Sequence, residues 1–125
     1  MAKKTTHVTD NILRVWDYDA DRLIMELDIT KLNEWDYWQE FLEYETSFRY
    51  VWTNHQGFTF VFSARKVMRS MYGGEPKPVW YAYKQISGKR RQLYLGKNEN
   101  LTAKKLQETA LKINQTQLPV EKASH

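Results

Sequence analysis

The sequence contains no cysteine, only three prolines and five glycines among 125 residues. Without cysteine the chain has no disulfide, thiol nucleophile or cysteine-ligated metal, which suits a reducing compartment. No apolar run approaches the roughly 20 residues that span a bilayer. The basic N-terminus is not followed by the apolar segment of a secretory signal. We therefore expect a cytoplasmic protein that has no membrane contact and binds no cofactor.

What the chain does contain is typical of a folded domain. It is 42% hydrophobic, 14% aromatic and 27% charged. Such aromatic and aliphatic side chains supply the buried surface that offsets chain entropy. We expect one domain over residues 11–116, between a flexible lead at 1–10 and a disordered tail at 117–125.

The charges are unevenly distributed along the sequence. Residues 1–62 contain six Lys or Arg and eleven Asp or Glu, a net charge of −5, whereas residues 63–125 contain thirteen and four, a net charge of +9. The expected domain therefore has an acidic half, 11–62, and a basic half, 63–116. This separation indicates one surface for a polyanion and another for a protein partner or solvent.

We expect the acidic half to begin with two strands and a helix. Residues 12–16 are β-rich, and residues 23–29 alternate apolar and polar side chains as a half-buried strand does. A turn at 19–21 separates them. A helix is predicted over about residues 31–44, because four apolar side chains recur at helical spacing. They are Trp35, Trp38, Phe41 and Leu42.

Two aromatic rows then predict a β-hairpin whose aromatic face covers this helix. The rows are Phe48, Tyr50 and Trp52, then Phe58, Phe60 and Phe62. A loop at residues 54–56 would place Trp52 opposite Phe58. Aromatic side chains at strand or helix spacing usually belong to a core. Residues 73–78, which contain Gly and Pro, are the best candidate for a linker.

Residues 79–86 and 90–96 predict a second hairpin around the pair Ser87-Gly88. A two-residue turn pairs Ala82 with Leu93 and Trp80 with Leu95 on one face. This apolar face should lie beneath a C-terminal helix for which Thr102 is the N-cap. The opposite face carries the tyrosines and glutamines.

Catalytic and metal-binding patterns are weak in this sequence. Asp17, Asp19 and Asp21 resemble the start of a calcium loop, but Arg22 stands where the loop requires Gly. The three histidines have no ligand spacing, and no nucleophile–base motif is present. We interpret the protein as a non-enzyme with no metal site.

The outer face of the second hairpin is the candidate functional site. Tyr, Gln and Arg on a β-ribbon can contact base edges, while Lys and Arg contact phosphates. The candidate residues on this face are Tyr81, Tyr83, Gln85, Arg90, Gln92 and Tyr94. The cations expected to contact phosphates are Lys89 at the turn, Arg91 on the edge of the other face, Lys97, Lys104 and Lys105. The alternative is that the tyrosines pack on the acidic half and the cations are merely solvated.

The same region resembles a small bacterial module. The similarity is carried by Trp80-Tyr81-Ala82-Tyr83, Gly88-Lys89, Tyr94-Leu95-Gly96-Lys97 and Leu101-Thr102, followed by Leu106 and Ala110. That module occurs as short stand-alone proteins and near the N-termini of ATP-binding transcriptional regulators of the maltose-regulator type. The resemblance covers residues 35–114, is more basic at 89–92, and implies no catalytic residues. A looser similarity is to the arm-type DNA-binding domain of tyrosine integrases, a three-stranded sheet backed by one helix.

The sequence as a whole predicts an α+β fold. We expect an antiparallel sheet with two hairpins, one helix in the N-terminal half and one at the C-terminus. The preferred function is that of an accessory or regulatory protein that binds double-stranded DNA through the basic, Tyr-rich hairpin face. The alternative is a protein-interaction module of a transcriptional or signalling system, which binds its partner through that face or through the acidic half.

Overall fold

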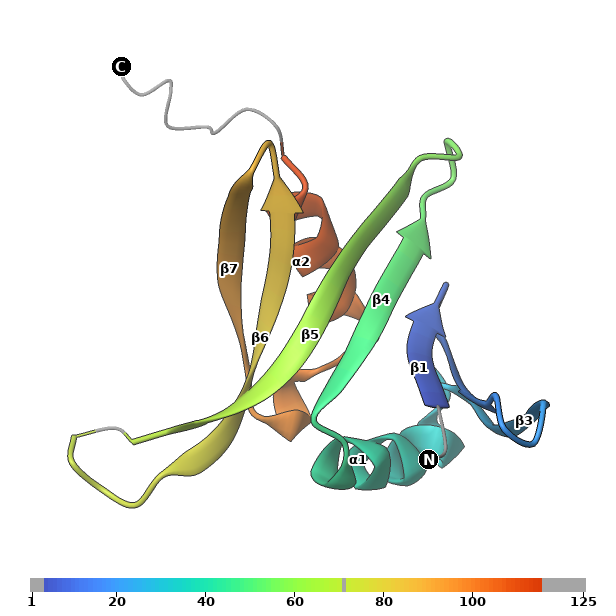
Figure 1. Cartoon of the computed structure of the whole chain (residues 1–125), viewed down its shortest axis with the longest axis horizontal. Coiled ribbons are helices and arrows are strands. Elements are labelled where there is room, and N and C mark those ends of the chain that lie inside the picture. Colours follow the sequence, from blue (N-terminus) through green and yellow to red (C-terminus); the bar gives the residue numbers. More distant parts are fainter. Residues whose placement is uncertain (1–3, 71, 116–125) are drawn as a thin grey trace.

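The computed structural model describes residues 4–70 and 72–115, and its fold is α+β as predicted (Figure 1). The strands are β1 (Lys4–Thr9), β2 (Ile12–Asp17), β3 (Arg22–Asp28), β4 (Ser47–Thr53), β5 (Thr59–Arg69), β6 (Lys77–Ile86) and β7 (Lys89–Gly96). The helices are α1 (Trp35–Tyr44) and α2 (Ala103–Ile113), with short 3-10 helices at Leu32–Glu34 and Asn98–Asn100. None of the helices in the described part of the chain is long and apolar enough to cross a membrane.

All seven strands form one sheet in the order β3-β2-β1-β4-β5-β6-β7. Neighbouring strands are antiparallel except β1 and β4, which are parallel. The sheet therefore has one parallel pair and more hairpins than the two predicted. It also joins the acidic and basic halves of the sequence into one layer.

The prediction of a flexible lead over residues 1–10 is wrong from Lys4 onward. Residues 4–9 form β1, and Val8 is fully buried between β2 and β4. The turn that follows is held by Asp10, whose N–H donates to Val51 O (2.9 Å) and whose carboxylate accepts from the Thr53 N–H (2.8 Å). The polar composition concealed this strand, because long-range pairing rather than local apolar content stabilises it. The predicted disordered tail at 117–125 lies outside the described residues.

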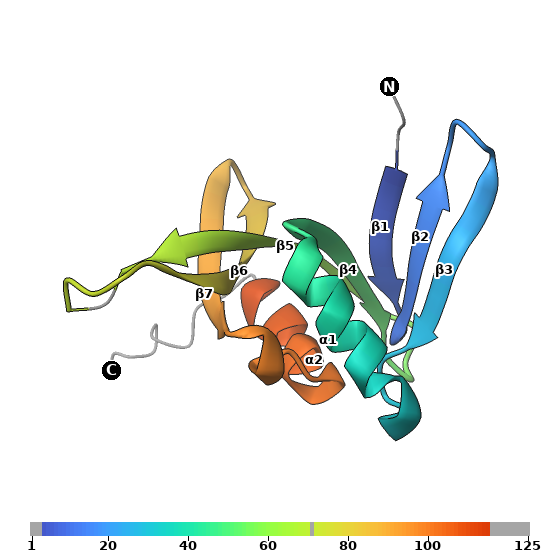
Figure 2. The same cartoon turned by 90° about the horizontal axis from the view of Figure 1, so that it is seen from below.

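The outer strand β3 forms where a strand was predicted, but it is not half-buried. Leu23, Ile24 and Met25 are all exposed. The strand lies at the edge of the sheet, beyond the area that the helices cover (Figure 2). Alternation therefore identified the strand but not its burial.

The aromatic hairpin forms in a register two residues away from the predicted one. Its pairs are Trp52 with Phe60, Tyr50 with Phe62 and Phe48 with Ala64. The loop is longer because the Asn54 side chain accepts from the N–H groups of Gln56 and Phe58 (both 2.9 Å), and Gly57 adopts a φ of +88°. A shift of two residues keeps the same side chains on each face. Phe58, however, moves into the loop and is 62% exposed instead of buried.

The basic stretch after this hairpin is strand, and residues 73–78 are not an interdomain linker. β5 continues to Arg69, and β6 begins at Lys77, where the two strands pair. Residues 72–76, which contain two glycines and a proline, belong to the tip of a long hairpin.

The second hairpin has the predicted register from the Tyr81–Tyr94 pair to the turn. A β-bulge between Trp80 and Tyr81 pairs Trp80 with Gly96 instead of Leu95. Trp80, Ala82 and Leu95 are buried as predicted, while Leu93 is partly exposed. Ser87 (φ +53°) and Gly88 (φ +77°) both adopt the left-handed conformation that such a tight turn requires.

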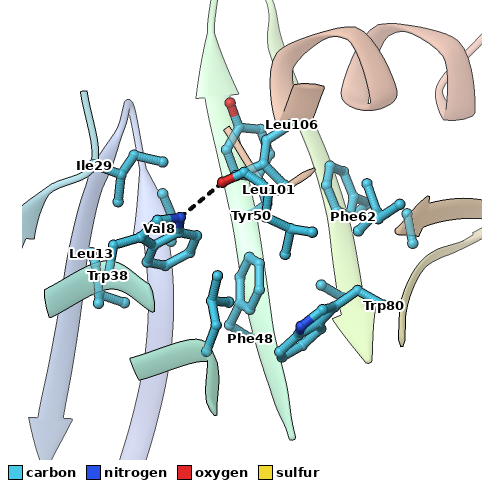
Figure 3. Close-up of a cluster of buried hydrophobic side chains, with 14 of the residues drawn as sticks. Val8, Leu13, Ile29, Trp38, Phe48, Tyr50, Phe62, Trp80, Leu101 and Leu106 are labelled. Atoms are coloured by element: carbon cyan, nitrogen blue, oxygen red, sulfur yellow. Dashed lines mark hydrogen bonds between the residues drawn. The ribbon is translucent and has the colours of Figure 1, made fainter. Parts of the chain in front are cut away.

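The core lies between one face of the sheet and the two helices (Figure 3). Trp38 of α1 donates from Nε1 to Leu101 O (2.8 Å), and its ring lies 5.7 Å from that of Phe48. The Phe48 ring in turn lies 5.3 Å from Trp80. The predicted N-cap of α2 is confirmed, because the Thr102 hydroxyl accepts from the Lys105 N–H (3.1 Å). Both helices therefore share a single core with the sheet.

Candidate functional site

The candidate site is the face of the sheet opposite the helices, which we call the open face. Side chains alternate along each strand, so the set that misses the core lies on this face. One row crosses all seven strands and consists of Glu26, Arg14, His7, Arg49, Ser63, Tyr83 and Gln92. In Figure 1 the strands β5 and β6 lie in front of α2. The helices therefore leave the residues of this row accessible to a partner.

A cationic groove lies on the open face where β5 and β6 separate. The β5–β6 ladder ends at the Ser63–Tyr83 pair, and beyond it Asn114 of α2 donates to Val61 O (3.0 Å). The groove has a volume of about 460 Å³ and is lined by Arg49, Val61, Phe62, Ser63, Arg65, Tyr83, Lys84, Gln85 and Arg90. All four of its charged lining residues are cations, of which Arg49, Arg65 and Arg90 belong to the open face and Lys84 to the side of its ladder partner Arg91.

Arg90 is held in this groove by an aromatic ring. Its guanidinium carbon lies 4.2 Å from the centroid of the Tyr83 ring. Such a cation–π contact is typically worth about 0.5–1 kcal/mol at exposed sites. It orients the guanidinium without using up its N–H donors, which stay free for an anion.

A second hollow, which we call the Tyr94 pocket, lies toward the opposite end of β6. Its volume is about 580 Å³, and its lining residues are Arg69, Gly74, Glu75, Lys77, Val79, Tyr81, Tyr94 and Lys97. The rings of Tyr81 and Tyr94 meet edge to face with centroids 5.4 Å apart. Arg69 donates to the Tyr81 hydroxyl, and its guanidinium carbon lies 5.6 Å from the ring centroid.

Most of the predicted site residues lie on the open face, divided between the two hollows. Tyr83, Gln85 and Arg90 line the cationic groove, and Lys89 is exposed at the turn beside it. The Tyr94 pocket contains Tyr81, Tyr94 and Lys97. Gln92 is exposed and pairs with Tyr83 in the ladder.

Arg91 lies on the helix-bearing side of the hairpin, the face on whose edge it was predicted. Its guanidinium donates to Ile113 O (3.2 Å) and to Gln115 O, at the end of α2. The C-terminus of a helix carries partial negative charge, so this contact stabilises α2. Arg91 is therefore engaged in the fold, and a role for it on the open face does not fit its position.

Lys104 and Lys105 are also separated from the open face. They lie in the first turn of α2, where Lys104 borders a small hollow of about 340 Å³ together with Ile29 and Trp35. A partner seated on the open face would not contact these lysines in the same groove.

Sequence reasoning missed several cations that the structure adds to the site. Arg49, Arg65, Arg69 and Lys77 line one hollow or the other. The signal was present, because Arg49 lies between the core residues Phe48 and Tyr50, and Arg65 follows the core residue Ala64. Alternation therefore places both arginines on the open face, opposite the aromatic ladder.

The acidic side chains gather elsewhere. Asp36, Glu40 and Glu43 are exposed on α1, on the helix-bearing side. On the open face, Glu26 of the edge strand β3 is paired with Arg14 (2.8 Å). Exposed carboxylates therefore gather on α1, whereas Arg49 of the acidic half joins the cations of the open face.

His7 extends the basic character of the open face toward β1. Burial and the neighbouring guanidinium groups of Arg14 and Arg49 lower the pKa of His7. The imidazole is therefore neutral near pH 7, and the nearby positive charge comes from the two arginines.

The described residues hold no group of three or more His, Asp or Glu that could bind a metal ion. The sequence matches no family model, no curated protein and no solved structure.

Proposed function

We propose that this protein binds double-stranded DNA through the open face, as a non-enzymatic cytoplasmic accessory or regulatory protein. One observation carries the proposal, which is that every charged residue lining the groove between β5 and β6 is a cation. Phosphate contacts supply much of the affinity of a protein for DNA. A groove with four cations and no lining carboxylate is suited to a phosphate backbone.

The shape of this region supports a duplex as the partner. Strands β5, β6 and β7 form a three-stranded antiparallel unit that α2 covers on one side only. The major groove of B-DNA is about 12 Å wide and admits a β-ribbon. In this arrangement Gln85, Arg90 and Gln92 would contact base edges, because glutamine pairs with adenine and arginine with guanine. Arg49 and Arg65 would contact phosphates.

A protein partner is the second candidate, and a different surface favours it. Tyr37 and Tyr44 of α1 are 61% and 79% exposed, and they lie among the acidic residues of that helix. Exposed tyrosines are enriched in protein interfaces, and carboxylates repel a phosphate backbone. An accessory protein could therefore hold DNA on the open face and a protein partner on α1.

The test compares two double charge reversals on opposite sides of the molecule. Arg49→Glu with Arg65→Glu should weaken binding to a short random-sequence duplex by at least about 100-fold at about 50 mM salt, because both contribute to the phosphate site. Lys104→Glu with Lys105→Glu changes the net charge equally and should weaken it by less than about tenfold. Fluorescence anisotropy at about 50 and 200 mM salt measures both effects.

Two results would contradict the proposal. Equal losses in the two double variants would mean that only net charge matters. No duplex binding by the wild type at the lower salt would leave the protein-interaction function. Thermal unfolding of each variant checks that the fold is retained, since exposed charges contribute little to stability.

A further inference from the structure

We propose that the Tyr94 pocket binds a nucleoside phosphate. This inference does not depend on DNA binding, because it rests on a separate hollow at the opposite end of β6. The volume of about 580 Å³ lies within the range of small-molecule sites. Its lining combines cations, an aromatic and aliphatic floor, and one carboxylate.

Three cations from three segments of the chain line the pocket and would hold the phosphate. Arg69 ends β5, Lys77 begins β6 and Lys97 follows β7. The guanidinium of Arg69 is positioned by its contact with the Tyr81 hydroxyl. That contact uses one of its five N–H donors, so others remain for a phosphate oxygen.

Tyr94 and Val79 also line the pocket and would contact the base. Tyr94 is 55% exposed, and its edge-to-face contact with Tyr81 fixes the ring while leaving area for stacking. Val79 is nearly buried and supplies apolar contact. Stacking of a base on an aromatic side chain is typically worth about 1–3 kcal/mol.

Glu75 distinguishes a nucleotide from other aromatic anions. A carboxylate only accepts hydrogen bonds, so Glu75 favours a ligand with N–H or O–H donors. A simple aromatic carboxylate such as benzoate would offer Glu75 no donor, and inorganic phosphate would leave the aromatic floor unused. Guanine has adjacent N–H groups on its Watson–Crick edge, which makes GMP the most suitable probe.

The ligand could be a free nucleotide or the phosphorylated end of a nucleic-acid strand. Titration calorimetry of the full chain with GMP, guanosine and inorganic phosphate tests the shared chemistry. GMP should bind at least about tenfold tighter than either part alone, because only GMP engages both the cations and the tyrosines of the pocket. Displacement of GMP by a short strand with a 5′-phosphorylated dG, but not by the same strand with a 5′-hydroxyl, would identify a strand end as the source.

Variants at exposed positions localise the site. Tyr94→Ala and Lys97→Glu should each weaken GMP binding by about tenfold or more, since they remove stacking and reverse a phosphate contact. Lys89→Glu is the matched control, because the same charge change lies at the turn beside the cationic groove and should leave GMP binding unchanged.

The proposal is overturned if GMP shows no saturable binding at millimolar concentration, or if guanosine or phosphate binds as tightly. It is also overturned if Lys89→Glu weakens GMP binding as much as Lys97→Glu. These titrations contain no DNA. A failure of the wild type to bind duplex would therefore remove the proposed function and leave the nucleotide site standing.

Discussion

Tyr50 places a polar hydroxyl inside an otherwise apolar core, and burial of this hydroxyl lowers the free energy of unfolding. Its side chain is fully buried, and its hydroxyl has no hydrogen-bond partner among the described residues. Burial, assisted by the charge of Asp10, raises the pKa of the phenol well above its ordinary value. The ring is nevertheless useful, because it lies 5.1 Å from that of Phe62 in the aromatic ladder. The hydroxyl adds only desolvation to this packing.

We predict that Tyr50→Phe stabilises the protein. Removing an unpaired buried hydroxyl should raise the free energy of unfolding by about 1 kcal/mol, and urea denaturation near pH 7 measures the change. Burial keeps the phenol protonated in the folded state, whereas the unfolded chain can ionise it above the unfolded pKa of about 10. The free energy of unfolding is therefore unaffected by this ionisation below that pH and falls as pH rises above it. The wild type should therefore lose more stability than Tyr50→Phe above that pH. A loss of stability in the variant near pH 7 would reveal a partner for the hydroxyl.

At the scale of elements, a cation from the sheet meets the C-terminal end of each helix. Lys66 of β5 donates to Glu43 O at the end of α1 (2.9 Å), and Arg91 of β7 donates to Ile113 O at the end of α2. Both side chains point to the helix-bearing side, while their strand neighbours Arg65 and Arg90 line the cationic groove. In β5 and β7, therefore, one cation stabilises a helix end and the adjacent cation lines the groove.

Substitutions of the neighbouring residues Arg90 and Arg91 should therefore affect different properties, DNA binding and stability respectively. Arg91→Ala should lower the free energy of unfolding by about 1–2 kcal/mol, because α2 loses a charged hydrogen bond at its C-terminus. Arg90→Ala should change stability by less than about 0.5 kcal/mol and instead weaken duplex binding. Thermal denaturation and anisotropy on both variants make the comparison. A stable Arg91→Ala variant with impaired DNA binding would reverse the assignment.

Sequence patterns predicted correctly those elements whose geometry depends on neighbouring residues in the chain. The second hairpin was predicted in register from the turn as far as the Tyr81–Tyr94 pair, because the turn Ser87-Gly88 fixes the pairing of its own strands, while the β-bulge beyond that pair was not foreseen. The register of the aromatic hairpin differs from the predicted one by two residues, because the Asn54 side chain stabilises a longer loop that alternation alone does not reveal. The register of the second hairpin correctly placed Arg90 on the open face. The cationic groove could not be predicted in this way, because it depends on where β5 separates from β6, and because Arg49 reaches it only through the pairing of distant strands.

At the scale of the molecule, the parallel pairing of β1 with β4 joins the β1–β3 segment to the rest of the sheet. β1 is an inner strand, with β2 on one side and β4 on the other. Val8 belongs to the same core as Trp80 and Leu106, which come from the basic half. No division of the chain into an acidic and a basic unit is therefore possible without breaking this core.

Val8→Asp should accordingly destabilise the whole molecule. An unpaired carboxylate at a fully buried position should lower the free energy of unfolding by about 3 kcal/mol or more. Tryptophan fluorescence and far-UV circular dichroism should report one coincident transition at a lower denaturant concentration. Two separate transitions would show that the β1–β3 segment unfolds independently. Thr9→Asp, at a partly exposed position of the same strand, is the control and should have a smaller effect.

The same parallel pairing has a kinetic consequence. The hairpin of β1 and β2 closes through the two residues Asp10 and Asn11, whereas β1 meets β4 only after about forty intervening residues have been ordered. Contacts between distant segments slow folding, because the entropy of loop closure is lost before the contact forms. During synthesis the first strand therefore emerges with one of its edges unpaired. Until residues 47–53 arrive to cover that edge, the nascent chain exposes a strand that can pair with another molecule, so rapid completion of the fold protects it from aggregation.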